Sequence, residues 1–225
     1  MTKILFSGGI LAALLTVIAA PASADELNFY TASPERPNII SARTGMAGAI
    51  VGELSYRRIL GLTDRLAVLG LDLSAPMAEL DTGDYSVRAT LALPLIERKH
   101  WKLIAALGPT LRSAENALNR SYALGADARA TFGYYGPRWF VASELGTELV
   151  GGAYIQNSAR YRKYVYADVK DGWYRDTGGS FYVGIHGGIS LSGIDVVLRL
   201  AHLRAWTLQP KNVPVLATIG VNAAF

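Results

Sequence analysis

The chain contains no cysteine among its 225 residues. Disulfide bonds are therefore excluded, and so is a lipid anchor attached to a cysteine that follows an export signal. Three histidines are present, and no pair of His, Asp or Glu has the spacing of metal ligands, so we expect neither a metal site nor a cofactor. The sequence also lacks a G-x-S-x-G nucleophile motif, a phosphate-binding loop and a dinucleotide fingerprint. A formal net charge of +4 is too small to indicate nucleic-acid binding.

Apolar runs long enough for a membrane-spanning helix are missing outside the N-terminal region. Residues 1–24 begin with one basic residue, Lys3, continue through an apolar stretch and end in the small triplet Ala22-Ser23-Ala24. This is the charged, apolar, A-x-A pattern of a secretory signal peptide. We expect cleavage after Ala24, which leaves about 200 residues, enough for a single exported domain.

Apolar and polar residues alternate with a period of two from about residue 44 onward. In the stretch 122–132 one face is small, polar or charged, and the other is wholly apolar. The apolar face consists of Tyr122, Leu124, Ala126, Ala128, Ala130 and Phe132. The same pattern recurs in 84–93, 100–112 and 181–191. A β-strand with two different faces has this period, so the sequence predicts an all-β protein.

The two faces favour a barrel in a membrane over a sheet in water. The polar face is rich in Gly, Ala and Ser with isolated charges, as a narrow interior requires, whereas a solvent-facing sheet usually carries more Lys, Glu and Thr. Aromatic residues stand at the ends of the apolar face, for example Tyr122 and Phe132. At about 3.3 Å per residue and a tilt near 40°, their separation spans roughly 25 Å, which matches the apolar band of an outer-membrane barrel between its aromatic girdles.

The C-terminal nonapeptide ATIGVNAAF adds a second indication. Thr218, Gly220, Ala223 and Phe225 stand at the positions of a polar residue, a glycine, an apolar residue and a terminal aromatic, and Ala223 is smaller than the residue usual at its position. This spacing resembles the terminal β-signal of bacterial outer-membrane β-barrel proteins. The resemblance implies an antiparallel, up-and-down transmembrane β-barrel that is recognised by the barrel assembly machinery and located in the outer membrane of a Gram-negative bacterium.

The alternation and the turn signals, among them the Gly-Gly pair at 151–152, predict ten strands, with eight or twelve as alternatives because single-chain bacterial barrels have even numbers. The predicted strands are 43–57, 64–75, 84–95, 100–112, 120–134, 138–149, 153–167, 179–191, 194–207 and 213–225. Residues 25–42 lack alternation and contain two prolines, so we expect a periplasmic lead-in or a short plug before a barrel formed by 43–225. The stretch 153–167 has no clean apolar face, and we expect it to rise above the membrane, to face a protein partner or not to be a strand.

Basic residues cluster at one predicted rim. If the chain enters the barrel from the periplasm, the predicted strands place the connections 58–63 and 96–99 outside the cell. The basic residues in and beside them are Arg57, Arg58, Arg98 and Lys99. We expect this rim to contact the phosphates of outer-membrane lipid, above all lipopolysaccharide.

Charges of both signs occur on the predicted interior faces. They include Arg88, Asp127, Arg129, Glu144, Glu148, Asp195 and Arg199. An unpaired charge in a confined interior is costly, so we expect paired networks that fill the lumen or line a thin path. The predicted function is a small structural or interaction barrel, or a narrow passage for polar solutes, without enzymatic activity.

Two alternatives remain open. A lipid-modifying hydrolase needs a serine activated by a histidine, and the candidates are His186 and Ser190, with Glu144 as an orienting carboxylate. His186 and Ser190 are four positions apart, about 13 Å along a strand, so a residue from another strand would have to complete the site. The second alternative is a soluble periplasmic β protein, in which Phe225 has no special role.

Removal of Phe225 tests the assembly signal. We expect the full-length protein to sediment with the outer membrane and to migrate as a compact species on gels unless it is heated. The variant without Phe225 is expected to lose both properties, because the terminal aromatic is part of the assembly signal. Fractionation followed by heat-modifiable gel migration measures this, and a truncated protein that still behaves like the full-length protein would show that Phe225 is dispensable.

Overall fold

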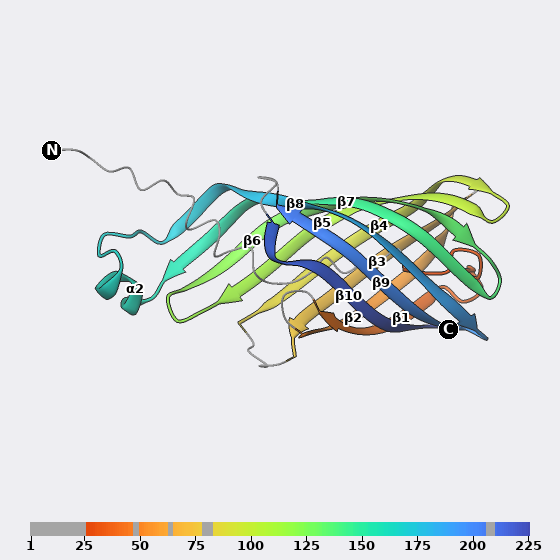
Figure 1. Ribbon diagram of the computed structural model, residues 1–225, viewed down its shortest axis with the longest axis horizontal. Helices are drawn as coiled ribbons and strands as arrows, with labels where there is room; N and C mark the ends of the chain where they lie inside the picture. The colour runs from red at the N-terminus through yellow and green to blue at the C-terminus, as the bar shows by residue number, and fades with distance from the viewer. Residues whose placement is uncertain (1–25, 47–49, 63–64, 78–82, 206–209) are drawn as a thin grey trace.

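The computed structural model describes residues 26–46, 50–62, 65–77, 83–205 and 210–225, and these residues form a closed antiparallel β-barrel of ten strands (Figure 1). The strands are β1 (Asn38–Met46), β2 (Ile50–Gly61), β3 (Leu66–Pro76), β4 (Tyr85–Arg98), β5 (Trp101–Glu115), β6 (Asn119–Tyr135), β7 (Trp139–Asn157), β8 (Gly172–Leu191), β9 (Ile194–Ala205) and β10 (Pro210–Ala224). Each strand pairs with the next in sequence, and β1 closes the ring against β10. The predicted fold class and the predicted number of strands are confirmed. Residues 1–24, the predicted signal peptide, lie outside the described residues.

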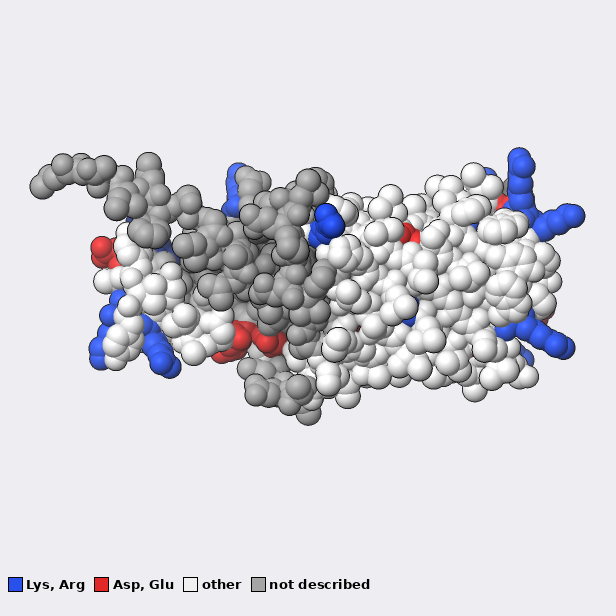
Figure 2. Space-filling model, in the orientation of Figure 1, with Lys and Arg blue, Asp and Glu red and all other residues white. Residues whose placement is uncertain are grey.

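Side chains alternate between the wall and the interior as the sequence pattern predicts. In β6 the side chains of Asp127 and Arg129 are buried, whereas Ala128 and Ala130 between and beside them are exposed. The exposed side of the barrel carries Leu, Ile, Val and aromatic residues over most of its height. In Figure 2 the middle of the visible wall is almost free of charge, and Lys and Arg gather towards the two ends. An apolar belt of this extent is stable in lipid rather than in water.

Aromatic rings mark the end of the barrel at which the chain terminates, called here the terminal end. Trp101 stacks on Phe132 with centroids 5.4 Å apart, and Tyr134 stacks on Trp139 at 4.8 Å. Phe225 follows β10 at the same end, where its amide donates to the Asn38 carbonyl at 2.9 Å. Thr218, Gly220 and Ala223 of the predicted assembly signal lie in β10, paired with β1.

The opposite end, called here the distal end, carries the helix α2 (Ala159–Tyr164) in the connection between β7 and β8 (Figure 1). Ser158 caps the helix by accepting a hydrogen bond from the Tyr161 amide. The Asn157 amide donates to Asp171 at 2.8 Å, which holds the pKa of the Asp171 carboxyl below its usual range, and Arg162 adds an ion pair at 2.7 Å. Among the described residues, no helix has the length and apolarity needed to cross a membrane.

Several predicted strand boundaries are wrong, although the total is right. The predicted strand 43–57 is two strands, β1 and β2. The predicted strands 138–149 and 153–167 are largely one strand, β7, which is followed by α2. Residues 38–42, predicted to precede the barrel, form the first part of β1.

This correction moves the predicted basic rim. Arg57 is not on a rim at all, because its side chain is fully buried inside the barrel and pairs with Asp72 at 3.1 Å. Arg58 pairs with Asn38 in the sheet, and Arg98 and Lys99 lie at the turn between β4 and β5, so these three residues are at the terminal end. The predicted orientation, with the chain termini in the periplasm, would put these three residues at the periplasmic end and not on the outer rim.

Substitution of Gly108 tests how closely β4 and β5 approach each other. A Cβ atom at this position would overlap the carbonyl oxygen of Ala89 on the neighbouring strand, which is backbone and cannot move aside without breaking the ladder. We expect Gly108→Val to abolish the compact unheated species on gels. Gly151→Ala is the matched control, because a Cβ there approaches only the Leu124 carbonyl oxygen, at 4.0 Å. A Gly108→Val protein as heat-resistant as wild type would contradict the close approach.

Candidate functional site

The N-terminal described residues enter the barrel at its terminal end. Glu26, Leu27, Asn28 and Phe29 are each at most 2% exposed, and residues 26–37 are called here the plug segment. Leu27 and Phe29 pack in an apolar layer contributed by most of the strands. Its other buried members are Ile39, Ile59, Val68, Ala92, Ile104, Ala106, Tyr135, Phe140, Ala142 and Val197. The plug segment and this layer together occupy the terminal end of the lumen.

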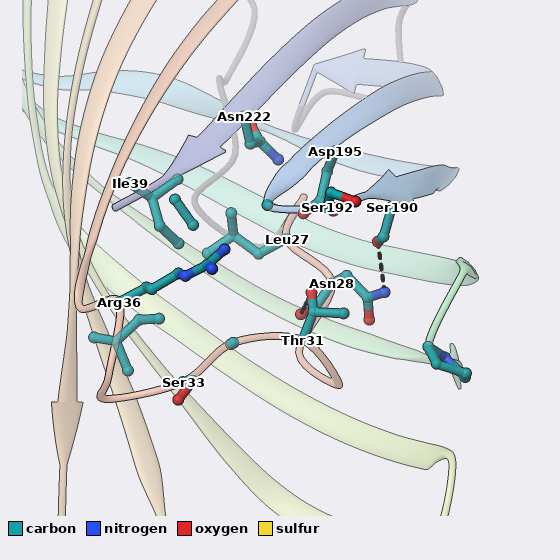
Figure 3. A pocket seen from close by; sticks show the side chains of 15 residues that line it. Leu27, Asn28, Thr31, Ser33, Arg36, Ile39, Ser190, Ser192, Asp195 and Asn222 are labelled. Atoms are coloured by element: carbon teal, nitrogen blue, oxygen red, sulfur yellow. Dashed lines mark hydrogen bonds between the residues drawn. The ribbon is translucent and has the colours of Figure 1, made fainter.

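Hydrogen bonds from several strands hold the plug segment in place. Asn28 Nδ2 donates to Ser190 Oγ at 2.8 Å (Figure 3). The same nitrogen donates to the Gly136 carbonyl, also at 2.8 Å. Lys102 Nζ donates to the Phe29 carbonyl at 3.0 Å, and Asn222 Nδ2 donates to the Glu26 carbonyl at 2.8 Å. A cavity of about 280 Å³ lies between the plug segment and the wall. Residues 26–29 of the plug segment are therefore held by hydrogen bonds that involve side chains, and near its end a backbone bond joins the segment to the wall, from the Ile59 amide to the Pro37 carbonyl at 2.7 Å.

Glu26 is the innermost described residue of the plug segment and its charged anchor. One carboxylate oxygen lies 3.4 Å from Arg43 Nε on β1, and the other lies 3.5 Å from Arg199 Nε on β9. All three side chains are at most 2% exposed. A carboxylate without these partners would be unfavourable at such depth.

Above the apolar layer the interior is lined by a set of charges, called here the lumen network. It contains six arginines and six carboxylates, namely Arg43, Arg57, Arg88, Arg112, Arg129, Arg199, Glu26, Glu53, Asp72, Asp127, Glu144 and Glu148. Arg199 Nε donates to Glu144 at 2.6 Å, and Arg43 lies 3.0 Å from Glu53. Within the described residues the charges of the network balance. Pairing of this kind offsets the cost of taking charges out of water.

The three arginines in the distal half of the network differ in how closely they are paired within the described residues. Arg112 bonds to Glu148, and Arg129 lies 3.9 Å from Asp127. Arg88 has no carboxylate within 4 Å among the described residues, and its Nε and Nη1 make no hydrogen bond to them. Its principal electrostatic partners are Asp127 and Glu148. Arg88 therefore presents N–H groups to the interior.

Six of the seven residues predicted to form the lumen charge network belong to it. The seventh, Asp195, lies apart at the terminal end, beside the cavity next to the plug segment. The Ser190 hydroxyl and the backbone N–H of Asn28 hydrogen-bond to its carboxylate. The sequence prediction missed Glu26 as a member, because the residues around it show no strand periodicity. It also placed Arg57 on a rim, because the predicted strand ended there. The strand β2 continues to Gly61, and Arg57 faces the interior like Ser55 and Ile59, two positions away on either side.

The structure does not assemble the predicted hydrolase site. Ser190 Oγ accepts from Asn28, whereas His186 faces Glu144, whose Oε2 lies 3.7 Å from Nδ1. That distance is too long for a direct hydrogen bond. No described contact joins Ser190 to His186. Among the described residues there is also no cluster of three His, Asp or Glu side chains that could hold a metal ion.

The chain is similar to several solved structures at low sequence identity. The outer membrane channel COG4313 from Pseudomonas putida F1 is 11% identical with a TM-score of 0.50, over 92% of this chain and 100% of the channel. The KdgM porin is 7% identical with a TM-score of 0.39, over 83% of this chain and 99% of the porin. Ail, the attachment invasion locus protein of Yersinia pestis, is 10% identical with a TM-score of 0.37, over 84% of this chain and 97% of Ail. No protein-family model and no curated protein matches the chain. The predicted resemblance to bacterial outer-membrane barrels is confirmed at the level of the fold.

Replacement of Glu144 by Gln tests the lumen network. The change keeps the size of the side chain but leaves Arg199 without its shortest ion pair, so we expect the free energy of unfolding to fall by about 3–5 kcal/mol. Urea unfolding in lipid vesicles measures it. Glu97→Gln is the control. Glu97 forms an ion pair with Lys102 that is partly exposed, and such a pair contributes about 0–1 kcal/mol to the free energy of unfolding. Equal losses in the two variants would show that the interior pair is not a stabilising element.

Proposed function

We propose that this protein is an outer-membrane barrel that acts as a narrow passage for small polar solutes and is closed at its terminal end by its own N-terminal segment. The observation that carries the proposal is the double ion pair of Glu26 with Arg43 and Arg199 inside the barrel. It makes the closure a short segment that polar contacts anchor at its inner end, beside the packing of Leu27 and Phe29, rather than a continuous part of the wall.

The chemistry of the interior supports a passage over a permanently filled barrel. Apolar side chains could fill a lumen without the desolvation cost of twelve buried charges, and replacing buried ion pairs by apolar groups is often neutral or stabilising. The larger apolar layer lies at the terminal end, where the plug segment lies, and a smaller buried apolar cluster in β8, β9 and β10 contains Tyr182, Ala201, Leu203 and Leu216. A polar lining is useful where water enters, and the lumen network is such a lining once the plug segment leaves.

The charge of the lumen network decides whether the open passage favours anions or cations. Six arginines face six carboxylates while Glu26 is in place, and withdrawal of the plug segment removes one carboxylate. Arginine then predominates, so the open passage is expected to favour small anions. Arg88, whose N–H groups point into the interior without a close carboxylate among the described residues, is the residue expected to contribute most to this preference.

The similarity to the Pseudomonas putida channel supports the fold on which this proposal stands. Recognition by the barrel assembly machinery through Thr218, Gly220, Ala223 and Phe225 is part of the proposal. So is location in the outer membrane after cleavage of residues 1–24.

Conductance across a planar lipid bilayer tests the plug segment. We expect wild type to be closed most of the time and Glu26→Gln to raise the open probability at least about tenfold, because breaking a buried ion pair costs more than the roughly 1.4 kcal/mol that corresponds to a factor of ten. Glu35→Gln is the matched control, since Glu35 belongs to the same segment but is exposed. Arg88→Glu in the Glu26→Gln background is expected to shift the reversal potential towards cations.

Each outcome of this experiment has a clear meaning. If Glu26→Gln folds, shows heat-modifiable migration and stays as closed as wild type, the barrel is a structural element and the passage is excluded. If Glu35→Gln opens the barrel equally, the closure does not depend on the Glu26 ion pairs.

A further inference from the structure

A groove on the outer wall lies outside the lumen and plays no part in the proposed passage. It has a volume of about 660 Å³ and lies over β6, β7 and β8 near the distal end. Its lining is apolar apart from one arginine, and includes Leu124, Leu149, Gly151, Gly152, Trp173 and Arg175. Since the wall faces lipid, this groove opens towards the membrane.

Two glycines keep the groove open without being needed for chain packing. A Cβ atom at Gly151 would approach only the Leu124 carbonyl oxygen, at 4.0 Å, and a Cβ at Gly152 would come no closer than 3.5 Å to its neighbour, Tyr174. Neither glycine has a positive φ angle. Glycine weakens a strand, and within a strand it often marks a place where a ligand approaches closely.

Two interruptions of the sheet meet at the same place. The register between β6 and β7 shifts at Leu124 and Gly125, and the register between β7 and β8 shifts between Val150 and Gly152. Bulges of this kind bend the wall locally and re-aim side chains. The hollow is therefore built into the backbone and does not depend on the rotamer of one side chain.

The groove lies beside the aromatic residues of the distal end. Tyr122 pairs with Tyr154 across β6 and β7, and the Tyr154 ring contacts Trp173 with centroids 5.6 Å apart. The next residues on the outer face, two positions closer to the middle of the wall, belong to the groove: Leu124 on β6, Gly152 on β7 and Arg175 on β8. Gly152 lies between the other two and pairs with each of them in the sheet. Aromatic girdles stand at the headgroup level of the bilayer, so the groove begins at that level and extends into the acyl region.

Arg175 gives the groove its charge. Its side chain is exposed on the wall, and no described carboxylate lies within 4 Å of it. A guanidinium on the lipid face is unfavourable unless it reaches a polar partner, and a phosphate is the partner that its planar fork fits best. Further cations lie at the same end: Arg120 stands over the Tyr122 ring at 5.2 Å, and Arg160 and Lys163 are exposed on α2.

We propose that this groove binds the lipid A part of lipopolysaccharide, with one acyl chain lying along Gly151 and Gly152 and a phosphate of the sugar headgroup on Arg175. With the chain termini in the periplasm the distal end lies in the outer leaflet, where lipid A is the phosphorylated lipid. An acyl chain supplies the apolar occupant that the glycines leave room for, and the phosphate supplies the anion that Arg175 lacks. The contact with lipopolysaccharide is thus assigned to the distal wall and not to Arg58, Arg98 and Lys99.

Native mass spectrometry of the full barrel in detergent with added lipid A tests the proposal. Arg175→Gln removes the cation, and Gly152→Leu fills the groove, and we expect each to weaken retention of diphosphorylated lipid A at least tenfold. The matched controls are Arg160→Gln, a distal cation away from the groove, and Ala130→Leu, an added apolar side chain elsewhere on the same wall; both are expected to stay within about twofold of wild type.

The lipid itself is varied to identify the source of the phosphate. Removing the phosphates from lipid A and removing the cation of Arg175 abolish the same contact. We therefore expect wild type to retain dephosphorylated lipid A as weakly as the Arg175→Gln variant retains diphosphorylated lipid A. Phosphatidylglycerol bound as tightly as lipid A would overturn the assignment to lipid A, and Arg175→Gln or Gly152→Leu proteins that retain lipid A like wild type would overturn the site. Should Gly152→Leu fail to fold, Gly151→Leu fills the same groove from a position with open space around it.

Discussion

The pairing of β1 with β10 is the contact on which the rest of the molecule depends. Asn38 and Phe225 exchange two backbone hydrogen bonds, at 3.2 and 2.9 Å, and the register continues from Ile39 opposite Ala224 to Met46 opposite Ala217. Once this seam is closed, the sheet has no free edge, and a membrane-spanning wall needs no other partner for its backbone. Closure also divides every side chain between an apolar outside and a confined inside. The alternation read from the sequence is a direct consequence of that division.

The seam and the plug segment are joined through one side chain. Arg43 lies on β1, pairs with Gly220 of β10 in the sheet and reaches Glu26 in the lumen. A Cβ atom at Gly220 would overlap the aliphatic part of the Arg43 side chain, so the glycine of the predicted assembly signal also makes room for the arginine that pairs with Glu26. The terminal strand therefore both closes the ring and contributes to the site that holds Glu26.

The sequence predicted the strands well where alternation is bounded by a clear turn. β5, β6 and β9 were predicted to within a few residues at most ends, because charged or glycine-containing turns separate them from their neighbours. β1 and β2 were merged because the alternation runs up to Met46 and resumes at Ile50 with no proline or turn pair between them. β7 was divided because Gly151 and Gly152 resemble a turn, whereas they lie at a bulge in a continuous strand. Glu26 escaped prediction for a different reason, since its environment is made by residues far away in the chain and no local pattern reports it.

The wall of the barrel is uneven in height. β6, β7 and β8 contain 17, 19 and 20 residues, whereas β1 contains 9, which is close to the minimum that crosses a bilayer. A bilayer responds to such a difference by thinning beside the short strands and thickening or tilting beside the long ones. The barrel therefore has a side with long strands and a side with short strands. Neighbouring proteins and lipids meet a different local thickness on each side, and the barrel imposes a preferred orientation on whatever assembles around it.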